Sequence, residues 1–236
     1  MRHVVFQYQA SPALTSRLRQ LSASGIEVGV AAPGDEAALA AALPDALVIW
    51  HVLEPVTAAL IARAPKLRLI QKIGVGVNTI DLEAARARGI AVCNMPGTNS
   101  RAVAELTLAL MLACLRRIPM LDAELRAGRG WQRPTAEIDS FGEIGGRTVG
   151  LVGYGAVPQL LAPVLRAMGA SVHYWTREPK PEAPEAWRPL PDLLETADIL
   201  SLHLPLTPET ECLIDGPALA RMRPGAVLIN LSLIHI

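Results

Sequence analysis

The stretch Thr148-Val149-Gly150-Leu151-Val152-Gly153-Tyr154-Gly155-Ala156-Val157-Pro158 decides the fold of this 236-residue chain. An apolar, β-branched run leads into a pair of glycines, and a segment with helical periodicity follows. The sequence therefore predicts a strand over 149–152, a tight turn, and a helix over 157–168. A strand, a glycine turn and a helix in this order begin a parallel βαβ unit.

The glycine turn is suited to binding the diphosphate of a dinucleotide. Gly153 can make the sharp turn, and Gly155 has no Cβ, so a phosphate can approach its backbone. A dinucleotide diphosphate also needs backbone N–H groups, which the positive end of the following helix offers. Pro158 replaces the third glycine of the usual fingerprint and removes one donor, which the first turn of a helix tolerates. A purely structural turn is the alternative, and the strand–turn–helix context favours cofactor binding.

The next predicted strand, 171–175, ends where the ribose of a nucleotide is usually recognised. In NAD sites an acidic residue about 20 residues beyond the glycines accepts a hydrogen bond from the ribose 2′-hydroxyl. Thr176 and Arg177 occupy this place here, and a guanidinium pairs well with the 2′-phosphate of NADP. We therefore expect NADP or NAD as cofactor, with NADP favoured. The alternative for Arg177 is a solvated loop cation.

The rest of the chain alternates between strands and helices. A long apolar helix over 102–125, with a break near Pro119, is expected to separate two such series. Alternation of this kind implies parallel pairing, so the predicted class is α/β, with two Rossmann-like or flavodoxin-like parallel-sheet domains, the second incomplete. The further predicted strands span residues 4–8, 26–30, 46–50, 67–73, 90–94, 199–202 and 226–229. One further predicted helix begins at residue 11. The others span residues 36–43, 57–64, 82–88, 192–196 and 217–222.

Charge and cysteine content exclude several classes of protein. Lys and Arg together number 22, as do Asp and Glu, and no long basic run is present, which argues against a nucleic-acid partner. The apolar run 102–115 contains Glu105 and is too short to span a bilayer, and the N-terminus lacks signal-peptide organisation. Cys93, Cys114 and Cys212 have no metal-binding spacing and are expected to be small buried hydrophobes. The sequence thus predicts a cytoplasmic protein without a metal site.

Four further motifs resemble the D-2-hydroxyacid dehydrogenase family. They are KIGVGVNTID at 72–81, NMPGTNSRAVAE at 94–105, SLHLPLT at 201–207 and MRPGAVLIN at 222–230. The resemblance runs from about residue 46 to Asn230, with the motifs in the family's order. It implies the N-terminal part of a substrate-binding domain at 1–98 and a dinucleotide-binding Rossmann domain at 99–236. It also implies a hinge near 96–101 and a homodimer joined around 102–131.

The resemblance also implies roles for individual residues. The backbone at Val75 and Gly76 would bind the carboxylate of the substrate, because oriented N–H dipoles suit an anion. The N–H groups of Ala156 and Val157 would donate to the diphosphate of the cofactor. Leu204 and Pro205 would line the wall near its nicotinamide and adenosine. His51 is a candidate for a substrate contact.

Two other polar residues are interpreted as structural. His203 stands at the end of a predicted strand, where a histidine more often fixes a loop than moves a proton. Glu105 lies in the predicted long helix, where a helix-cap or interdomain polar contact is the expected role. Neither residue is assigned to catalysis.

The family's catalytic residues do not occur in this chain. In the family an Arg-Gly segment follows the last strand present here, and a Glu and a proton-transferring His come later. Residues 231–236 read Leu-Ser-Leu-Ile-His-Ile instead, the translation of a transposase end sequence used in sequencing libraries. We interpret 231–236 as non-native, do not cast His235 as the catalytic histidine, and expect this truncated chain to be inactive by itself.

The predicted function of the parent protein is hydride transfer between NAD(P)H and a small 2-oxo or 2-hydroxy acid, with glyoxylate and hydroxypyruvate as leading substrates. One alternative is a nucleotide-sensing regulatory protein on the same fold, which would not need the Arg, Glu and His together. A hydrolase that uses bound NAD is a third possibility. The motif at 94–105 argues against the hydrolase.

Overall fold

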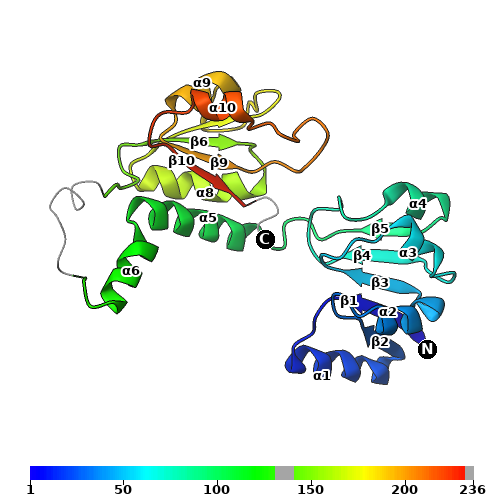
Figure 1. Ribbon diagram of the computed structural model, residues 1–236. Coiled ribbons are helices and arrows are strands. Elements are labelled where there is room, and N and C mark those ends of the chain that lie inside the picture. Colours follow the sequence, from blue (N-terminus) through cyan, green and yellow to red (C-terminus); the bar gives the residue numbers. More distant parts are fainter. Residues whose placement is uncertain (131–140, 232–236) are drawn as a thin grey trace. The chain divides into compact units, whose positions relative to one another are not determined.

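The computed structural model describes residues 1–130 and 141–231. The chain divides into two compact units, Met1–Thr98 and Asn99–Ile236, and each contains one five-stranded sheet (Figure 1). Every strand pair in both sheets is parallel. The predicted α/β class with two parallel sheets is therefore confirmed.

Unit 1 has the strand order β2-β1-β3-β4-β5. Its core lies between one face of the sheet, with Val5, Ile49 and Ile70, and the helices α2, α3 and α4. A Ser, Thr or Asp side chain accepts a backbone N–H at the start of each of the four α-helices. The elements are β1 (Arg2–Gln7), α1 (Pro12–Gln20), η1 (Leu21–Ser24), β2 (Ile26–Val30), α2 (Glu36–Ala42), η2 (Leu43–Asp45), β3 (Val48–His51), α3 (Ala58–Ala62), β4 (Leu69–Lys72), α4 (Leu82–Ala87) and β5 (Ala91–Cys93).

Unit 2 has the strand order β10-β9-β6-β7-β8. Helices α5 and α8 cover one face of this sheet, and α9 and α10 cover the other (Figure 1). The elements are α5 (Ser100–Leu115), α6 (Ile118–Arg126), β6 (Thr148–Val152), α8 (Ala156–Ala167), β7 (Ser171–Trp175), β8 (Ala186–Trp187), α9 (Leu190–Thr196), β9 (Ile199–Leu202), α10 (Gly216–Arg221) and β10 (Val227–Asn230).

The predicted long helix over 102–125 is two helices. The chain breaks at Arg117, which has a left-handed backbone (φ 51°), before the expected position at Pro119. Pro119 lies in the first turn of α6, where its missing N–H costs no hydrogen bond, so the interruption must precede it. The two-residue strand β8 was not predicted. It pairs with β7 at the edge of the sheet, within a segment rich in proline.

The prediction that the three cysteines are buried is wrong. Cys93, Cys114 and Cys212 are free and exposed. Cys114 lies off the buried stripe of α5, whose buried residues recur every three or four positions and include Met111 and Leu115. Cys212 has a positive φ of 53° in a surface turn. Over the residues that the structure describes, no helix is long and apolar enough to cross a membrane.

Candidate functional site

The glycine loop of unit 2 lies at the carboxyl end of β6, the central strand. The strand order reverses between β6 and β9, and in open parallel sheets such a reversal opens a crevice outside the strand ends. The N–H of Gly153 donates to the carbonyl of Trp175 at the end of β7 (2.8 Å). A side-chain carbon of Leu204, which follows β9, lies 3.0 Å from the place a Cβ on Gly153 would take. The structure thus brings the glycine loop and Leu204 together.

Gly153 is required for two reasons. Its φ of 96° is one that residues with a side chain rarely adopt. A Cβ at this position would also lie only 2.5 Å from the carbonyl oxygen of His203. His203 is fixed there because its N–H donates to the carbonyl of Val152 (2.8 Å). The sequence indicates the tight turn, and the structure adds the close approach of the neighbouring strand end.

Gly155 and the first turn of α8 form an open set of donors. Gly155 is the N-cap of α8, and no atom of residues 1–130 or 141–231 lies within 4 Å of the place its Cβ would occupy. The N–H groups of Ala156 and Val157 donate to no acceptor among the described residues, as expected for the first turn of a helix. Two free amides at the positive end of a 12-residue helix, beside open space, fit a diphosphate.

Thr176 and Arg177 follow β7, the strand next to the glycine loop. The hydroxyl of Thr176 donates to the carbonyl of Glu178 (2.5 Å), and its own carbonyl accepts from the indole of Trp187 (3.0 Å). Arg177 is exposed. The pKa of the Glu209 carboxyl lies below its usual value, first because of a hydrogen bond with Thr207 and, to a smaller extent, because of the Arg177 charge. Arg177 therefore already has an anionic neighbour.

Pro205, the last of the predicted cofactor-binding residues, is exposed after β9. Its carbonyl accepts a hydrogen bond from the hydroxyl of Thr210 (2.6 Å), and that hydroxyl in turn accepts from the N–H of Thr207 (2.8 Å). These bonds fold the segment after β9 back on itself close to the crevice.

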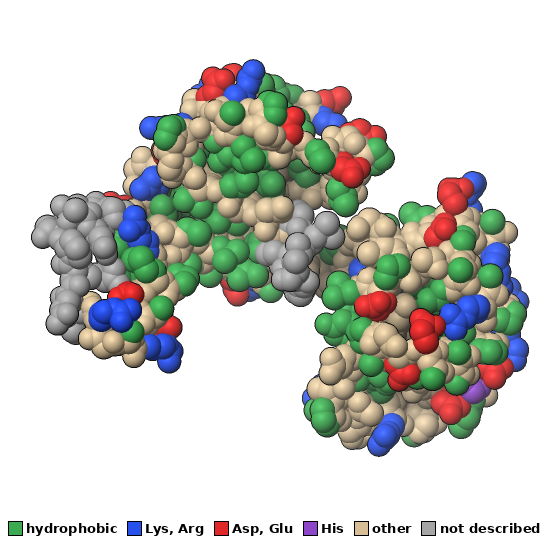
Figure 2. Space-filling view, viewed as in Figure 1, with side chains coloured by type: hydrophobic (Ala, Val, Ile, Leu, Met, Phe, Trp, Pro, Cys, Tyr) green, Lys and Arg blue, Asp and Glu red, His purple; other side chains and the backbone are tan. Residues whose placement is uncertain are grey.

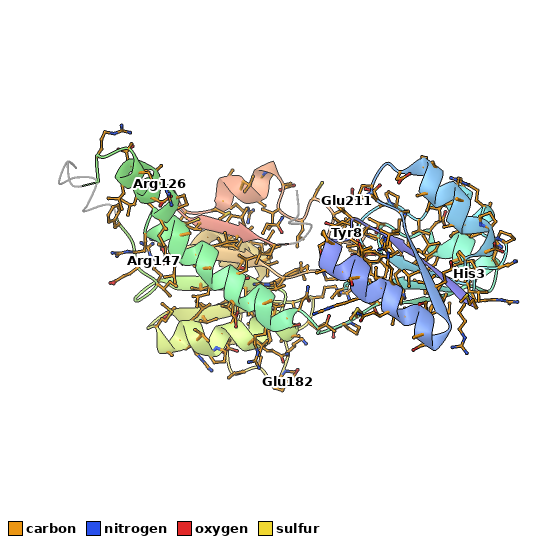
Figure 3. The ribbon with its side chains drawn as sticks, turned by 90° about the horizontal axis from the view of Figure 1, so that it is seen from below. His3, Tyr8, Arg126, Arg147, Glu182 and Glu211 are labelled. Carbon is orange, nitrogen blue, oxygen red and sulfur yellow. The ribbon has the colours of Figure 1, made fainter. Side chains whose placement is uncertain are left out.

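A buried polar cluster behind the glycine loop was not predicted. The hydroxyl of Tyr154 donates to the carboxylate of Glu185, whose side chain is 1% exposed and lies 3.3 Å from the guanidinium of Arg166. Burial, and then the bond to Glu185, raise the pKa of Tyr154. The segment that carries Glu182 and Glu185 runs beside α8 (Figure 3). No motif in the sequence links these three residues, since the partners are far apart along the chain.

The predicted substrate loop of unit 1 follows β4. The side-chain amide of Asn94 donates to the carbonyl of Val75 (2.8 Å), and the N–H of Met95 donates to the carbonyl of Gly74 (2.8 Å). The N–H groups of Val75 and Gly76 donate to no acceptor in the described ranges. The carbonyls of the loop are therefore held by the chain after β5, while two neighbouring amides remain free, an arrangement that suits a carboxylate.

His51 and Lys72 lie side by side on β3 and β4, below this loop. His51 is completely buried, and its Nε2 lies 3.2 Å from the hydroxyl of Thr79, so its side chain does not reach the surface of unit 1. The ammonium of Lys72 donates to the carbonyl of Val52, and burial lowers its pKa. Among the described residues, no three His, Cys, Asp or Glu side chains are grouped so that they could hold a metal ion.

Two histidines, the buried His51 and the partly buried His203, predict a loss of stability in acid. Burial, and then the charge of Lys72, lower the pKa of His51 to about 4, and burial lowers that of His203 to about 4. Both are neutral in folded and unfolded chains above their ordinary pKa of 6.5. As the pH falls from there towards 4, the unfolded chain binds protons that the folded chain does not. Each histidine should therefore cost ~2–3 kcal/mol of unfolding free energy over this range.

Urea unfolding at neutral pH and at pH ~4.5 tests this expectation. The variant His203→Gln should lose part of the pH dependence. An unchanged urea midpoint between the two pH values in the unsubstituted protein would contradict it.

Comparison with known proteins identifies the family. A sequence profile described as "D-isomer specific 2-hydroxyacid dehydrogenase, NAD binding domain" matches residues 108–233. The D-3-phosphoglycerate dehydrogenase of Mycobacterium bovis is 41% identical over 201 residues, covering 83% of this chain and 37% of that protein. The glyoxylate reductase of Thermococcus litoralis is 40% identical over 196 residues, covering 80% of this chain and 59% of that protein.

A solved structure agrees with these relatives. The NAD-dependent formate dehydrogenase of Staphylococcus aureus, crystallised in complex with NAD, is similar with a TM-score of 0.88 at 25% identity, over 98% of this chain and 73% of that one. The chain spans less than two thirds of the length of the two curated relatives above. It belongs to the D-isomer specific 2-hydroxyacid dehydrogenase family.

Proposed function

We propose that the protein is an oxidoreductase that transfers a hydride between NAD(H) and a small 2-oxo or 2-hydroxy acid. The observation that carries this proposal is the pair of free amides at Ala156 and Val157, beside the open side of Gly155 at the point where the strand order reverses. The family profile is that of an NAD-binding domain, and relatives are named glyoxylate reductase and hydroxypyruvate reductase. A small 2-oxo acid such as glyoxylate is the substrate that these names support.

Each unit has its own part in this proposal. When bound, the nicotinamide supplies or accepts the hydride. Residues 99–236 would hold the cofactor, with Leu204 and Pro205 lining its pocket, and residues 1–98 would form part of the substrate domain. There the free amides of Val75 and Gly76 would orient the carboxylate of the substrate. We also propose that residues 231–236 are non-native. Of these, residues 232–236, which include His235, lie outside the described ranges.

The quench of tryptophan fluorescence on adding NADH tests cofactor binding by this chain, and NADH oxidation with glyoxylate or hydroxypyruvate tests turnover by the full-length protein. We expect saturable binding of NADH and turnover of at least one of the two acids. Binding without turnover would favour the nucleotide-sensing alternative. Absence of both would refute the proposal.

A preference for NADP(H) remains a separate proposal that rests on Arg177. If its guanidinium pairs with the 2′-phosphate, Arg177→Ala should weaken NADPH binding about tenfold or more and leave NADH binding unchanged, because charged hydrogen bonds contribute ~1.5–3 kcal/mol. The matched control is Arg188→Ala, at the exposed end of β8. Equal small effects on the two nucleotides would leave NAD(H) as the cofactor.

We also propose a cytoplasmic homodimer. Figure 2 shows hydrophobic side chains gathered over α5 and α8 of unit 2. Exposed large side chains on α5 and α6, including Leu106, Ile118 and Leu125, support an interface there. Trp131, at the end of the predicted interface, lies outside the described residues. Light scattering coupled to size-exclusion chromatography should give twice the monomer mass, and a monomer would refute this part.

A further inference from the structure

The glycine loop Gly153–Gly155 has a single side chain, that of Tyr154. Gly153 is fixed at the strand end because its N–H donates to the carbonyl of Trp175. The N–H groups of Tyr154 and Gly155 donate to no acceptor among the described residues, and the space beside Gly155 is open. Because glycine loses more conformational freedom on ordering than any other residue, a loop of this composition needs an anchor to keep its shape.

The side chain of Tyr154 supplies this anchor on the inner side of the loop. It is 5% exposed, whereas Gly155 and Ala156 are exposed on the side proposed for the diphosphate. Its ring packs on the ring of Tyr174 in β7, with the two centroids 4.5 Å apart. Its hydroxyl donates to the carboxylate of Glu185. A hydrogen bond is directional, so this one fixes the orientation of the Tyr154 side chain and of the backbone that bears it.

Glu185 is itself held in place by the sheet and by α8. Strand β8 pairs with β7 in a register that joins His173 to Ala186, the residue after Glu185. One carboxylate oxygen of Glu185 accepts from Tyr154, and the other lies 3.3 Å from the guanidinium of Arg166 in the last turn of α8. Glu185 therefore connects the glycine loop with the far end of the helix whose first amides would bind the diphosphate.

A buried carboxylate in this place contributes little to stability by itself. The side chain of Glu185 is 1% exposed, and its Oε1 makes no hydrogen bond in the described parts of the chain. Removal of a carboxylate from water opposes folding, and apolar residues that replace a buried ion pair often give an equally stable protein. The directional bond to Tyr154 is what an apolar residue could not provide.

We propose that Glu185 is a positioning residue of the nucleotide site, which acts through Tyr154 to hold the amides of Ala156 and Val157 where a diphosphate would meet them. A loop that is ordered before binding spares the nucleotide the entropic cost of ordering it. This inference rests on the proposed function, because it assigns Glu185 to the same nucleotide site.

Nitrogen-15 relaxation of the nucleotide-free protein tests the anchoring without assuming the function. Tyr154→Phe removes the hydroxyl and keeps the ring, so the backbone order parameters of Gly155 and Ala156 should fall. The matched control is Asp198→Asn. Asp198 is a carboxylate of the same unit that accepts from the N–H of Thr148 (2.9 Å), at the opposite end of β6, and also pairs with an arginine. This control should leave the order parameters of the loop unchanged, and unchanged values in Tyr154→Phe would overturn the proposal.

A double variant separates positioning from stability. NADH affinity should fall about tenfold in Tyr154→Phe and in Glu185→Leu. When both changes are combined, two apolar side chains replace the buried polar pair, so the thermal midpoint should recover. NADH affinity should stay low, because no hydrogen bond directs the loop. Glu185→Gln should retain more affinity than Glu185→Leu, since its amide oxygen still accepts from Tyr154. Recovery of NADH affinity together with the thermal midpoint in the double variant would refute the proposal.

Two nucleotide fragments show whether the effect lies at the diphosphate. Tyr154→Phe should weaken the binding of ADP about as much as that of NADH and leave the binding of adenosine, which has no phosphate, unchanged. Equal weakening of ADP and adenosine, followed by two-dimensional NMR, would contradict a role at the diphosphate. If the unsubstituted protein bound neither NADH nor ADP, the proposed function would fail, and the order parameters would still decide whether Glu185 anchors the loop.

Discussion

Replacing Gly153 by alanine is expected to destabilise unit 2 by ~2–5 kcal/mol and to abolish nucleotide binding. The φ of 96° alone costs an L-residue ~1–2 kcal/mol. The added Cβ would also lie 2.5 Å from the carbonyl oxygen of His203, which is backbone and cannot rotate away. Relief of this clash would separate the ends of β6 and β9. Overpacking of this kind typically lowers the free energy of unfolding by a further ~1–3 kcal/mol.

Gly146→Ala is the matched control for the clash. Gly146 lies in the same unit with a positive φ of 74°, and nothing lies within 4 Å of the place its Cβ would take. Its substitution should therefore cost only the backbone strain, ~1–2 kcal/mol. Urea unfolding of both variants isolates the contribution of the His203 contact as the difference between them. Equal losses would show that the close approach of the two strand ends does not constrain Gly153.

The comparison of Gly153 with Tyr154 shows how far the sequence could predict this site. The glycine was predictable because its role is local: a strand must turn into a helix within three residues. The polar cluster around the next residue, Tyr154, was not predictable. Tyr154 donates to Glu185, which lies 31 positions away in a segment with no regular pattern. Local sequence carries turn chemistry and periodicity, whereas such a pairing depends on the sheet order that brings β8 beside β7.

The same distinction explains the errors in the helices and cysteines. The sequence correctly predicted from Pro119 that the long helix is interrupted. The position of the interruption depends on whether the proline ends one helix or begins the next. Here Pro119 lies in the first turn of α6, so the interruption comes before it. The exposure of Cys93 depends on its place at the end of the edge strand β5. A residue's type predicts burial only when the position of its strand or helix in the layers is also known.

In unit 1 the sequence indicated the loop at Val75 and Gly76 but not what orients it. Asn94 follows β5, which pairs with β4 in parallel, so the ends of the two strands meet. Its side chain then holds the carbonyl of Val75, while the amides of Val75 and Gly76 have no acceptor among the described residues. The proposed carboxylate-binding element is thus a pair of loops, of which the glycine motif marks only one.

Replacing Gly155 by valine is expected to abolish nucleotide binding without destabilising the fold, the opposite pattern to Gly153→Ala. The backbone of Gly155 (φ −95°, ψ −156°) is extended and open to any residue, and no atom of the described residues lies within 4 Å of its Cβ position. The unfolding free energy should change by less than about 0.5 kcal/mol. The new side chain would fill the space in which a diphosphate approaches the amides of Ala156 and Val157, so NADH affinity should fall by about two orders of magnitude or more.

Gly216→Val is the matched control, because Gly216 also opens a helix in unit 2 with no atom near its Cβ position. Both variants should unfold at nearly the same urea concentration as the unsubstituted protein, while only Gly155→Val loses the NADH-dependent quench of tryptophan fluorescence. If Gly155→Val bound NADH normally, the open side of this glycine would not be the diphosphate site. The free amides at the start of α8 would then be no more than the N–H groups that lack a partner in the first turn of any helix. The proposed oxidoreductase function would lose the observation that carries it.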